Sequence, residues 1–155
     1  MPVYRHVDGR DLSEICENIA KYREIGVKTI RCQCGGYGGS EYGHTPAGAP
    51  VGAKPGVYLD GNAYIRDTVK LFDGIRSKMG DEIGLVHDVH ERIAPADAVR
   101  LAKELEPYHL TFLEDPVSLE QVEYIRQIKT LPPFPSRKAS CSTTPRRTAP
   151  LITER

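Results

Sequence analysis

Two short stretches decide the fold of this chain: Leu85-Val86-His87-Asp88-Val89-His90 and Phe112-Leu113-Glu114-Asp115-Pro116. Each opens with an apolar run that predicts a buried strand, and each closes in acidic or imidazole side chains. Because successive parallel strands lie about 4.8 Å apart, we expect the carboxylates of Asp88 and Glu114 to converge at one sheet edge. His90 stands two residues after Asp88, so we expect it on the same side of an extended segment.

Strands and helices alternate through the first 130 residues. The expected strands are 3–6, 27–32, 83–86 and 110–113, and the expected helices are 11–25, 62–79, 95–105 and 118–128. Asp11 and Ser118 are the expected N-caps, Gly26 should end the first helix, and Pro95 suits a first helical turn. Four strand-then-helix units predict a parallel sheet, either an open α/β sheet or half of a (β/α)₈ barrel.

Two other segments have a different composition. Residues 33–61 are rich in Gly and Pro, which predicts a long loop of the kind that is usually functional or disordered. From Leu131 onward Pro, Ser, Thr and Arg replace the apolar pattern, and this composition is typical of disorder. We therefore divide the chain into residues 1–130, which carry the fold, and an irregular tail over 131–155.

The overall composition points to a soluble cytoplasmic protein. No apolar run is long enough to span a bilayer, and the first residues lack the order of a signal peptide. The four cysteines lack the spacing of a zinc site, so reduced thiols are expected.

The strand ends carry the chemistry. Mg²⁺ prefers oxygen ligands and usually takes only a few from protein, so Asp88 and Glu114 are suitable first ligands. His90 beside them is a candidate acid or base. The alternative is that all three are ordinary polar residues at the ends of strands, and the pattern alone leaves that alternative open.

Longer stretches resemble a known family. Leu85–Ile93, Leu105–Tyr108 and Phe112–Pro116 look like the barrel domain of the enolase superfamily, in its mandelate racemase and muconate lactonizing enzyme-like branch. Within it they resemble the D-mannonate dehydratase group, as do the segments 3–11 and 30–35. The resemblance covers roughly residues 1–130 and implies a partial TIM-type (β/α) barrel of about the first four βα units, with an irregular C-terminal tail.

The resemblance also implies roles. Asp88 and Glu114 would be two of three Mg²⁺ ligands, and His90 would be the general acid that protonates the departing 3-hydroxyl. Arg31 and Tyr42 match the pair that removes the proton α to the carboxylate, with Tyr37 as the competitor for Tyr42. The implied reaction is the dehydration of D-mannonate or a related aldonate to a 2-keto-3-deoxy sugar acid, a lyase step of carbohydrate catabolism. Galactonate- and rhamnonate-type dehydratases share the Asp-x-His pattern, so the substrate stays open.

The sequence also departs from the family. The third metal ligand should be a Glu near Ser140, where no Glu stands. The resemblance also implies a capping domain and a second half-barrel, and we expect this chain to lack both. We therefore expect an inactive fragment with open sheet edges, although the intact family forms homo-oligomers. A translated frameshift over 131–150 would explain the changed composition.

A function of another class is a binding or regulatory protein whose basic tail contacts nucleic acid. There is no Asp or Glu between Tyr124 and Thr153, a stretch that carries six Lys and Arg. The stretch lacks interleaved aromatics and helical periodicity. The expected partner is therefore a small sugar acid, rather than nucleic acid or a membrane.

Overall fold

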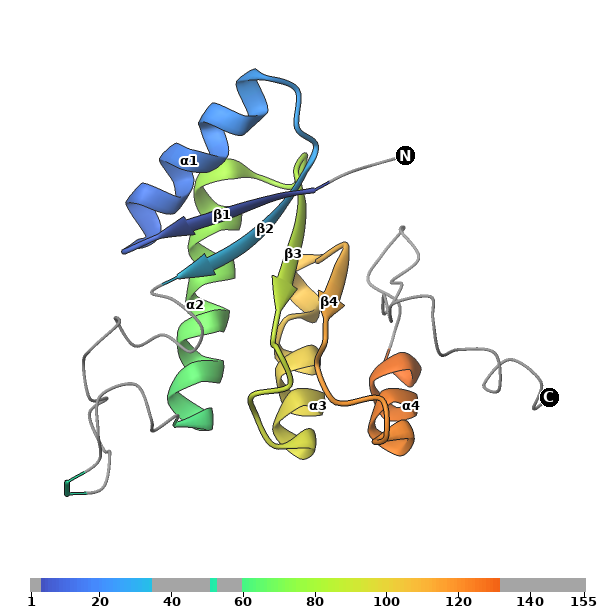
Figure 1. Ribbon diagram of the computed structural model, residues 1–155. Helices are drawn as coiled ribbons and strands as arrows, with labels where there is room; N and C mark the ends of the chain where they lie inside the picture. The colour runs from blue at the N-terminus through green and yellow to red at the C-terminus, as the bar shows by residue number, and fades with distance from the viewer. Residues whose placement is uncertain (1–3, 35–50, 53–59, 132–155) are drawn as a thin grey trace.

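The computed structural model describes residues 4–34, 51–52 and 60–131. Within these ranges strands and helices alternate (Figure 1). The strands are β1 (Arg5–Gly9), β2 (Thr29–Cys34), β3 (Gly84–Asp88) and β4 (Phe112–Glu114). The helices are α1 (Leu12–Glu24), α2 (Gly61–Met79), α3 (Pro95–Glu104), the short 3₁₀ helix η1 (Glu106–Tyr108) and α4 (Val122–Thr130).

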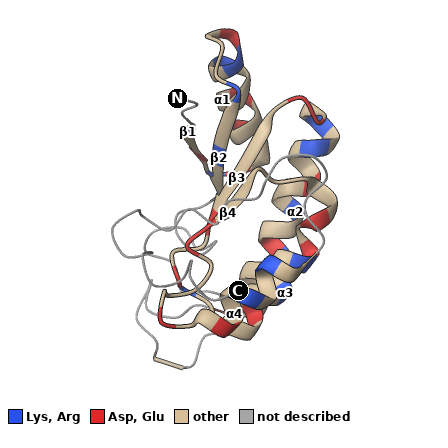
Figure 2. Ribbon diagram, turned by 90° about the vertical axis from the view of Figure 1, so that its right-hand side faces the viewer, with Lys and Arg blue, Asp and Glu red and all other residues tan. Residues whose placement is uncertain are grey.

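The four strands form one parallel sheet in the order β1-β2-β3-β4, as the alternating pattern predicted. The register places His6 beside Arg31, Arg31 beside Val86, and Val86 beside Phe112. Figure 2 shows α2 and α3 together on one side of the sheet. Because side chains alternate along a strand, each strand serves two different faces.

We call these the helix-covered face and the inner face. The helix-covered face presents Val7, Ile30, Cys32, Leu85, His87 and Leu113. The inner face presents Tyr4, His6, Asp8, Arg31, Gln33, Val86, Asp88, Phe112 and Glu114. The first set is apolar apart from His87, whereas the second is mostly polar.

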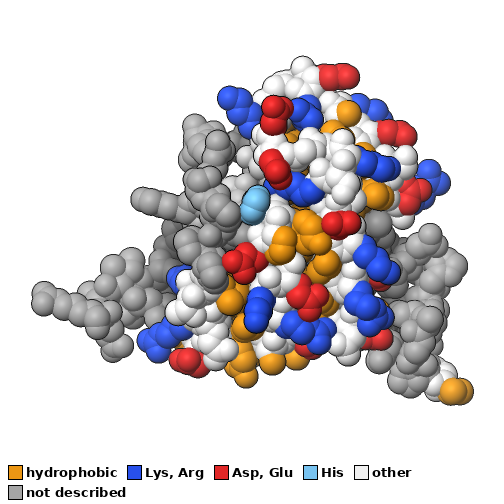
Figure 3. Space-filling view, turned by 180° about the vertical axis from the view of Figure 1, so that it is seen from behind, with side chains coloured by type: hydrophobic (Ala, Val, Ile, Leu, Met, Phe, Trp, Pro, Cys, Tyr) orange, Lys and Arg blue, Asp and Glu red, His pale blue; other side chains and the backbone are white. Residues whose placement is uncertain are grey.

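The hydrophobic core lies between the sheet and the helices. Its largest members are fully buried, with Phe72 and Ile75 of α2 and Leu101 of α3 all at 0% exposure. Burying side chains of this size supplies most of the favourable free energy of folding. On the outer side of the molecule, acidic and basic side chains are interspersed (Figure 3).

The helix boundaries confirm most of the expected signals. Asp11 caps α1 by accepting a hydrogen bond from the Glu14 backbone N–H at 2.9 Å, and Pro95 is in the first turn of α3. The cap predicted at Ser118 is wrong. Residues 118–121 first make a turn, in which the Gln121 N–H donates to the Ser118 carbonyl, so α4 begins only at Val122.

The strands begin one or two residues later than predicted. Val27, Ile83 and Leu110 are apolar and packed against or within the core, but they precede the hydrogen-bonded ladder. Periodicity detects burial, and burial starts before strand pairing. Most of the predicted loop over 33–61 and nearly all of the tail over 131–155 lie outside the described residues. No described helix is long and apolar enough to cross a membrane.

Candidate metal and acid–base site

The carboxylates of Asp88 and Glu114 are the centre of the site. The two residues are direct register partners at the carboxyl ends of β3 and β4, as their positions in the sequence predicted. Asp88 is almost fully buried, with 2% of its side chain exposed, and Glu114 is 17% exposed. Two carboxylates this close repel each other unless a cation lies between them.

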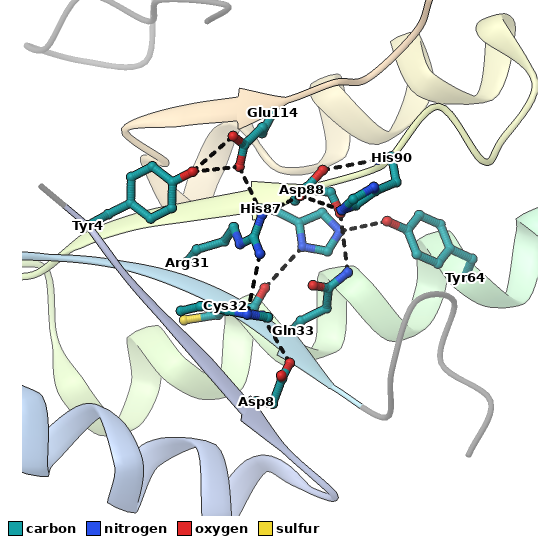
Figure 4. Close-up of polar contacts among 11 residues, drawn as sticks. Tyr4, Asp8, Arg31, Cys32, Gln33, Tyr64, His87, Asp88, His90 and Glu114 are labelled. Atoms are coloured by element: carbon teal, nitrogen blue, oxygen red, sulfur yellow. Dashed lines mark hydrogen bonds and ion pairs between the residues drawn. The ribbon is translucent and has the colours of Figure 1, made fainter. Parts of the chain in front are cut away.

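Arg31 supplies that cation (Figure 4). Its Nη1 atom donates to Asp88 Oδ2 at 2.5 Å and to Glu114 Oε2 at 3.3 Å. Its Nη2 atom donates to His6 Nδ1 at 3.3 Å, and Asp8 Oδ1 lies 3.0 Å from the other ring nitrogen of His6. The guanidinium of Arg31, on β2, therefore contacts side chains of β1, β3 and β4 on the inner face.

Burial and neighbouring charges shift the pKa values of Asp88 and Arg31. Burial raises the pKa of the Asp88 carboxyl, and the nearby Glu114 charge adds to this, although His90 and Arg31 act in the opposite direction. Burial acts to lower the pKa of the Arg31 guanidinium, but the charges of Asp88 and Glu114 outweigh it, so that pKa is raised. Arg31 therefore stays protonated. Burial still makes the ionised form of Asp88 less favourable than it would be in water.

His90 contacts Asp88, but by a different route from the one predicted. The chain leaves the extended conformation after β3, and His90 has φ +55°, in the left-handed region. Its backbone N–H donates to Asp88 Oδ1 at 3.1 Å, and its Nε2 lies 2.7 Å from Asp88 Oδ2. A tight turn, rather than strand alternation, brings the imidazole and the carboxylate together.

Sequence reasoning missed Tyr4 as part of the site. The Tyr4 hydroxyl donates to Glu114 Oε1 at 2.9 Å and to Oε2 at 3.2 Å, and its ring packs edge-on against Phe112. Burial and the neighbouring Glu114 raise the pKa of the Tyr4 phenol. The contact joins residues 110 positions apart, and no local pattern signals it.

His87 was also missed, although it stands inside the deciding stretch. It lies on the helix-covered face, where Tyr64 Oη is 2.7 Å from its Nε2 and the Cys32 carbonyl oxygen is 3.2 Å from its Nδ1. Burial lowers the pKa of His87 to about 4, so the ring is neutral near pH 7. The available signal was that His87 stands two residues after Leu85 and two before Val89, so strand alternation would place it on their apolar face.

The other predicted site residues cannot be placed. Tyr42, its competitor Tyr37 and the segment near Ser140 lie outside the described residues. Among the residues that are described, no group of three or more His, Cys, Asp or Glu side chains is arranged to hold a metal ion. In the part of the chain that is described, the candidate metal ligands are therefore the two carboxylates of Asp88 and Glu114.

Comparison with known proteins identifies the family. The model of the family described as enolase C-terminal domain-like matches residues 15–139. The chain belongs to this family. The resemblance inferred from the two deciding stretches is thereby confirmed, and the four βα units are part of an enolase-superfamily barrel domain.

Individual relatives of this enolase-family chain are sugar-acid enzymes by name. A D-galactonate dehydratase family member from Musicola paradisiaca is 38% identical over 143 residues, covering 83% of this chain and 34% of that protein. A D-mannonate dehydratase from Xanthomonas oryzae pv. oryzicola is 36% identical, covering 84% of this chain and 33% of that protein.

A solved structure gives the same result for the fold. The crystal structure of an enolase from Pantoea ananatis with bound D-gluconate and Mg superposes with a TM-score of 0.74 at 35% identity, covering 90% of this chain and 36% of that one. The enolase-family chain thus spans about a third of the length of the relatives that it matches.

Proposed function

We propose that this chain carries the first part of the active site of a Mg²⁺-dependent sugar-acid dehydratase, and that D-mannonate or a related aldonate is the substrate. The carrying observation is the convergence of Asp88 and Glu114 on a single cationic atom, Arg31 Nη1, with His90 in contact with Asp88. The names of the relatives support the sugar-acid class. Since the described residues offer two metal ligands and no group of three, the chain by itself is proposed to be inactive.

The donor set fits Mg²⁺. Asp88 and Glu114 offer only carboxylate oxygens, the ligand type that this ion prefers, and in the structure both already face one positive charge. These two residues would hold the ion. When bound, Mg²⁺ would stabilise the negative charge that develops on the substrate carboxylate as the α proton is lost.

His90 is proposed as the general acid. Its imidazole is 38% exposed, so a substrate hydroxyl has access to it, and its Nε2 atom lies 2.7 Å from Asp88 Oδ2. Its backbone N–H is held by the other Asp88 oxygen, which limits the positions that the ring can take. The ring is thus placed to give a proton to a departing hydroxyl.

Arg31 is proposed to support the base rather than to act as the base. Its guanidinium is held in the protonated form by two carboxylates and cannot accept a proton. A neighbouring phenol would be more acidic beside this positive charge, and Tyr42 is the proposed proton acceptor. Tyr4 is unsuited to that role, because burial and Glu114 raise its pKa. The reaction would take place in the cytoplasm, where free thiols such as Cys16 and Cys32 persist.

A chimera tests this function. Residues 4–131 replace the matched segment of the Pantoea ananatis protein, and the product is assayed with Mg²⁺ on D-mannonate, D-gluconate and D-galactonate for 2-keto-3-deoxy acid. We expect turnover from the chimera and none from the isolated chain. The matched control His90→Asn should fold and bind Mg²⁺ but lose roughly 10²–10⁴-fold in kcat. A folded, Mg²⁺-binding chimera that dehydrates none of the three acids contradicts the proposal.

A further inference from the structure

The backbone ladder between β2 and β3 stops at Arg31 and Val86, before either strand ends. Its last register pair is Arg31 with Val86, although β2 continues to Cys34 and β3 to Asp88. On either side the ladders continue, from β1 to β2 as far as Cys34 and from β3 to β4 as far as Asp88. The two middle strands therefore separate where their residues reach the site.

Two side chains bridge this separation. His87 Nδ1 is 3.2 Å from the Cys32 carbonyl oxygen, and Gln33 Nε2 donates to the Asp88 carbonyl oxygen at 3.4 Å. A carbonyl oxygen only accepts, so Nδ1 of His87 must carry the proton. In the neutral ring Nε2 is then an acceptor, and the Tyr64 hydroxyl donates to it at 2.7 Å. The bridge made by His87 is the shorter of the two. The hydroxyl of Tyr64, on α2, holds the His87 ring in place.

Each end of the His87 bridge is next to a site residue. Cys32 follows Arg31, and His87 precedes Asp88, on the strands that the bridge joins. Because alternate residues point to opposite faces, a bond on the helix-covered face sets the positions of Arg31 and Asp88 on the inner face. The ring itself is 2% exposed and packs edge-on against Phe72 at 5.5 Å between ring centroids, so it has little freedom to move.

We propose that His87 is a positioning residue, whose side chain sets the spacing between the ends of β2 and β3 and thereby the contact between Arg31 and Asp88. The proposal uses the proposed function only in taking Arg31 and Asp88 as site residues. The bridge, the fixed tautomer and the Tyr64 contact exist without metal or substrate. The competing explanation is that His87 is a core residue whose polar atoms are merely satisfied.

Two polar substitutions of His87 separate these explanations. In His87→Asn the amide nitrogen can stand near the place of Nδ1 and keep the bond to Cys32. In His87→Gln the amide reaches toward Tyr64 instead and leaves the Cys32 carbonyl without its donor. Phe72→Leu is the packing control, because it loosens the ring's surroundings and leaves both hydrogen bonds.

The readout is the NMR signal of the Arg31 guanidinium in the whole chain, without metal. We expect a downfield, slowly exchanging Arg31 signal in the wild type, in His87→Asn and in Phe72→Leu. In His87→Gln this signal should move toward the position of a free arginine. The imidazole ¹⁵N shifts of the wild type should show a proton on Nδ1 and none on Nε2.

The proposal is overturned if His87→Gln leaves the Arg31 signal unchanged, or if Phe72→Leu moves it equally. A wild-type ring with its proton on Nε2 overturns it as well. Should His87→Gln not fold, the tautomer and the Arg31 signal of His87→Asn still decide, because a lost Arg31 signal in that folded variant contradicts the bridge. Mg²⁺ plays no part in these measurements, so a failed proposed function and a failed bridge give different results.

Discussion

The two faces of the sheet are built from the same strands and differ in almost every physical respect. The helix-covered face buries apolar side chains against α1, α2 and α3. The inner face holds Asp88, Glu114 and Arg31 in mutual contact, with Tyr4 and His6 at the margins. Alternate residues of one strand therefore serve the core and the candidate site, so that His87 faces the core while the adjacent Asp88 faces the site.

The largest expected effect is on the helix-covered face. Phe72→Ala removes a fully buried ring from the centre of the core. We expect a loss of about 4 kcal/mol in the free energy of unfolding, from lost burial and the cavity that remains. Urea unfolding of the wild type and of the variant measures this difference in free energy. A loss below about 1 kcal/mol would show that this face does not carry the stability of the fold.

The next effect is on the inner face and depends on a cation. Arg31→Met leaves two adjacent carboxylates without their positive partner, and we expect a loss of roughly 3 kcal/mol. Millimolar Mg²⁺ should restore part of this loss, because the ion can replace the guanidinium charge. Thermal melts with and without Mg²⁺ measure both parts.

The matched control for this variant is Asp88→Asn. The raised pKa of Asp88 shows that the folded state does not favour its charge, so this variant should change stability little and should not respond to Mg²⁺. Equal melting curves for Arg31→Met in Mg²⁺ and in a chelator would argue against a cation site.

A smaller effect appears on acidification. The pKa of His87 is lowered to about 4 by burial, against about 6.5 when unfolded, so protons bind the unfolded chain first. The contribution of the neutral His87 ring to the free energy of unfolding is fully present above pH 6.5 and is lost as the pH falls toward 4. The loss between pH 7 and pH 5 amounts to about 2 kcal/mol. Asp88 acts in the opposite direction, because its pKa is raised.

Denaturant melts at pH 7 and pH 5 test this loss. The drop should be absent in His87→Asn, which has no group that titrates there. A drop of the same size in that variant would assign the acid sensitivity to other residues.

The smallest effect is expected at the margin of the inner face. Tyr4→Phe removes a hydroxyl that bonds Glu114, from a residue that is 37% exposed. We expect at most about 1 kcal/mol, because water can replace the lost partner. Thermal or urea melts measure this loss. A loss in the free energy of unfolding as large as that of Phe72→Ala would mean that the two faces contribute equally to stability, which contradicts the difference between them.

The sequence predicts what repeats or alternates, and it misses what depends on the tertiary path. Asp88 and Glu114 could be placed together because each ends an apolar run and parallel strands share an edge. The Asp11 cap is local and was also predictable. The Tyr4 contact with Glu114 requires knowing how the sheet brings the start of β1 to the end of β4. His90 depends on a left-handed turn that a strand pattern does not reveal, and Ser118 lost its cap role to a turn of the following residues.

A Mg²⁺ titration of the chain, followed by NMR at the backbone amides of 88–90 and 114–115, tests whether Asp88 and Glu114 form a cation site. We expect weak, saturable shifts at these amides in the wild type and no shifts in Asp88→Asn. Binding should be tighter in Arg31→Met, because the competing guanidinium is gone. Shifts that are absent from the wild type and from Arg31→Met, or unchanged in Asp88→Asn, would contradict a cation site formed by Asp88 and Glu114.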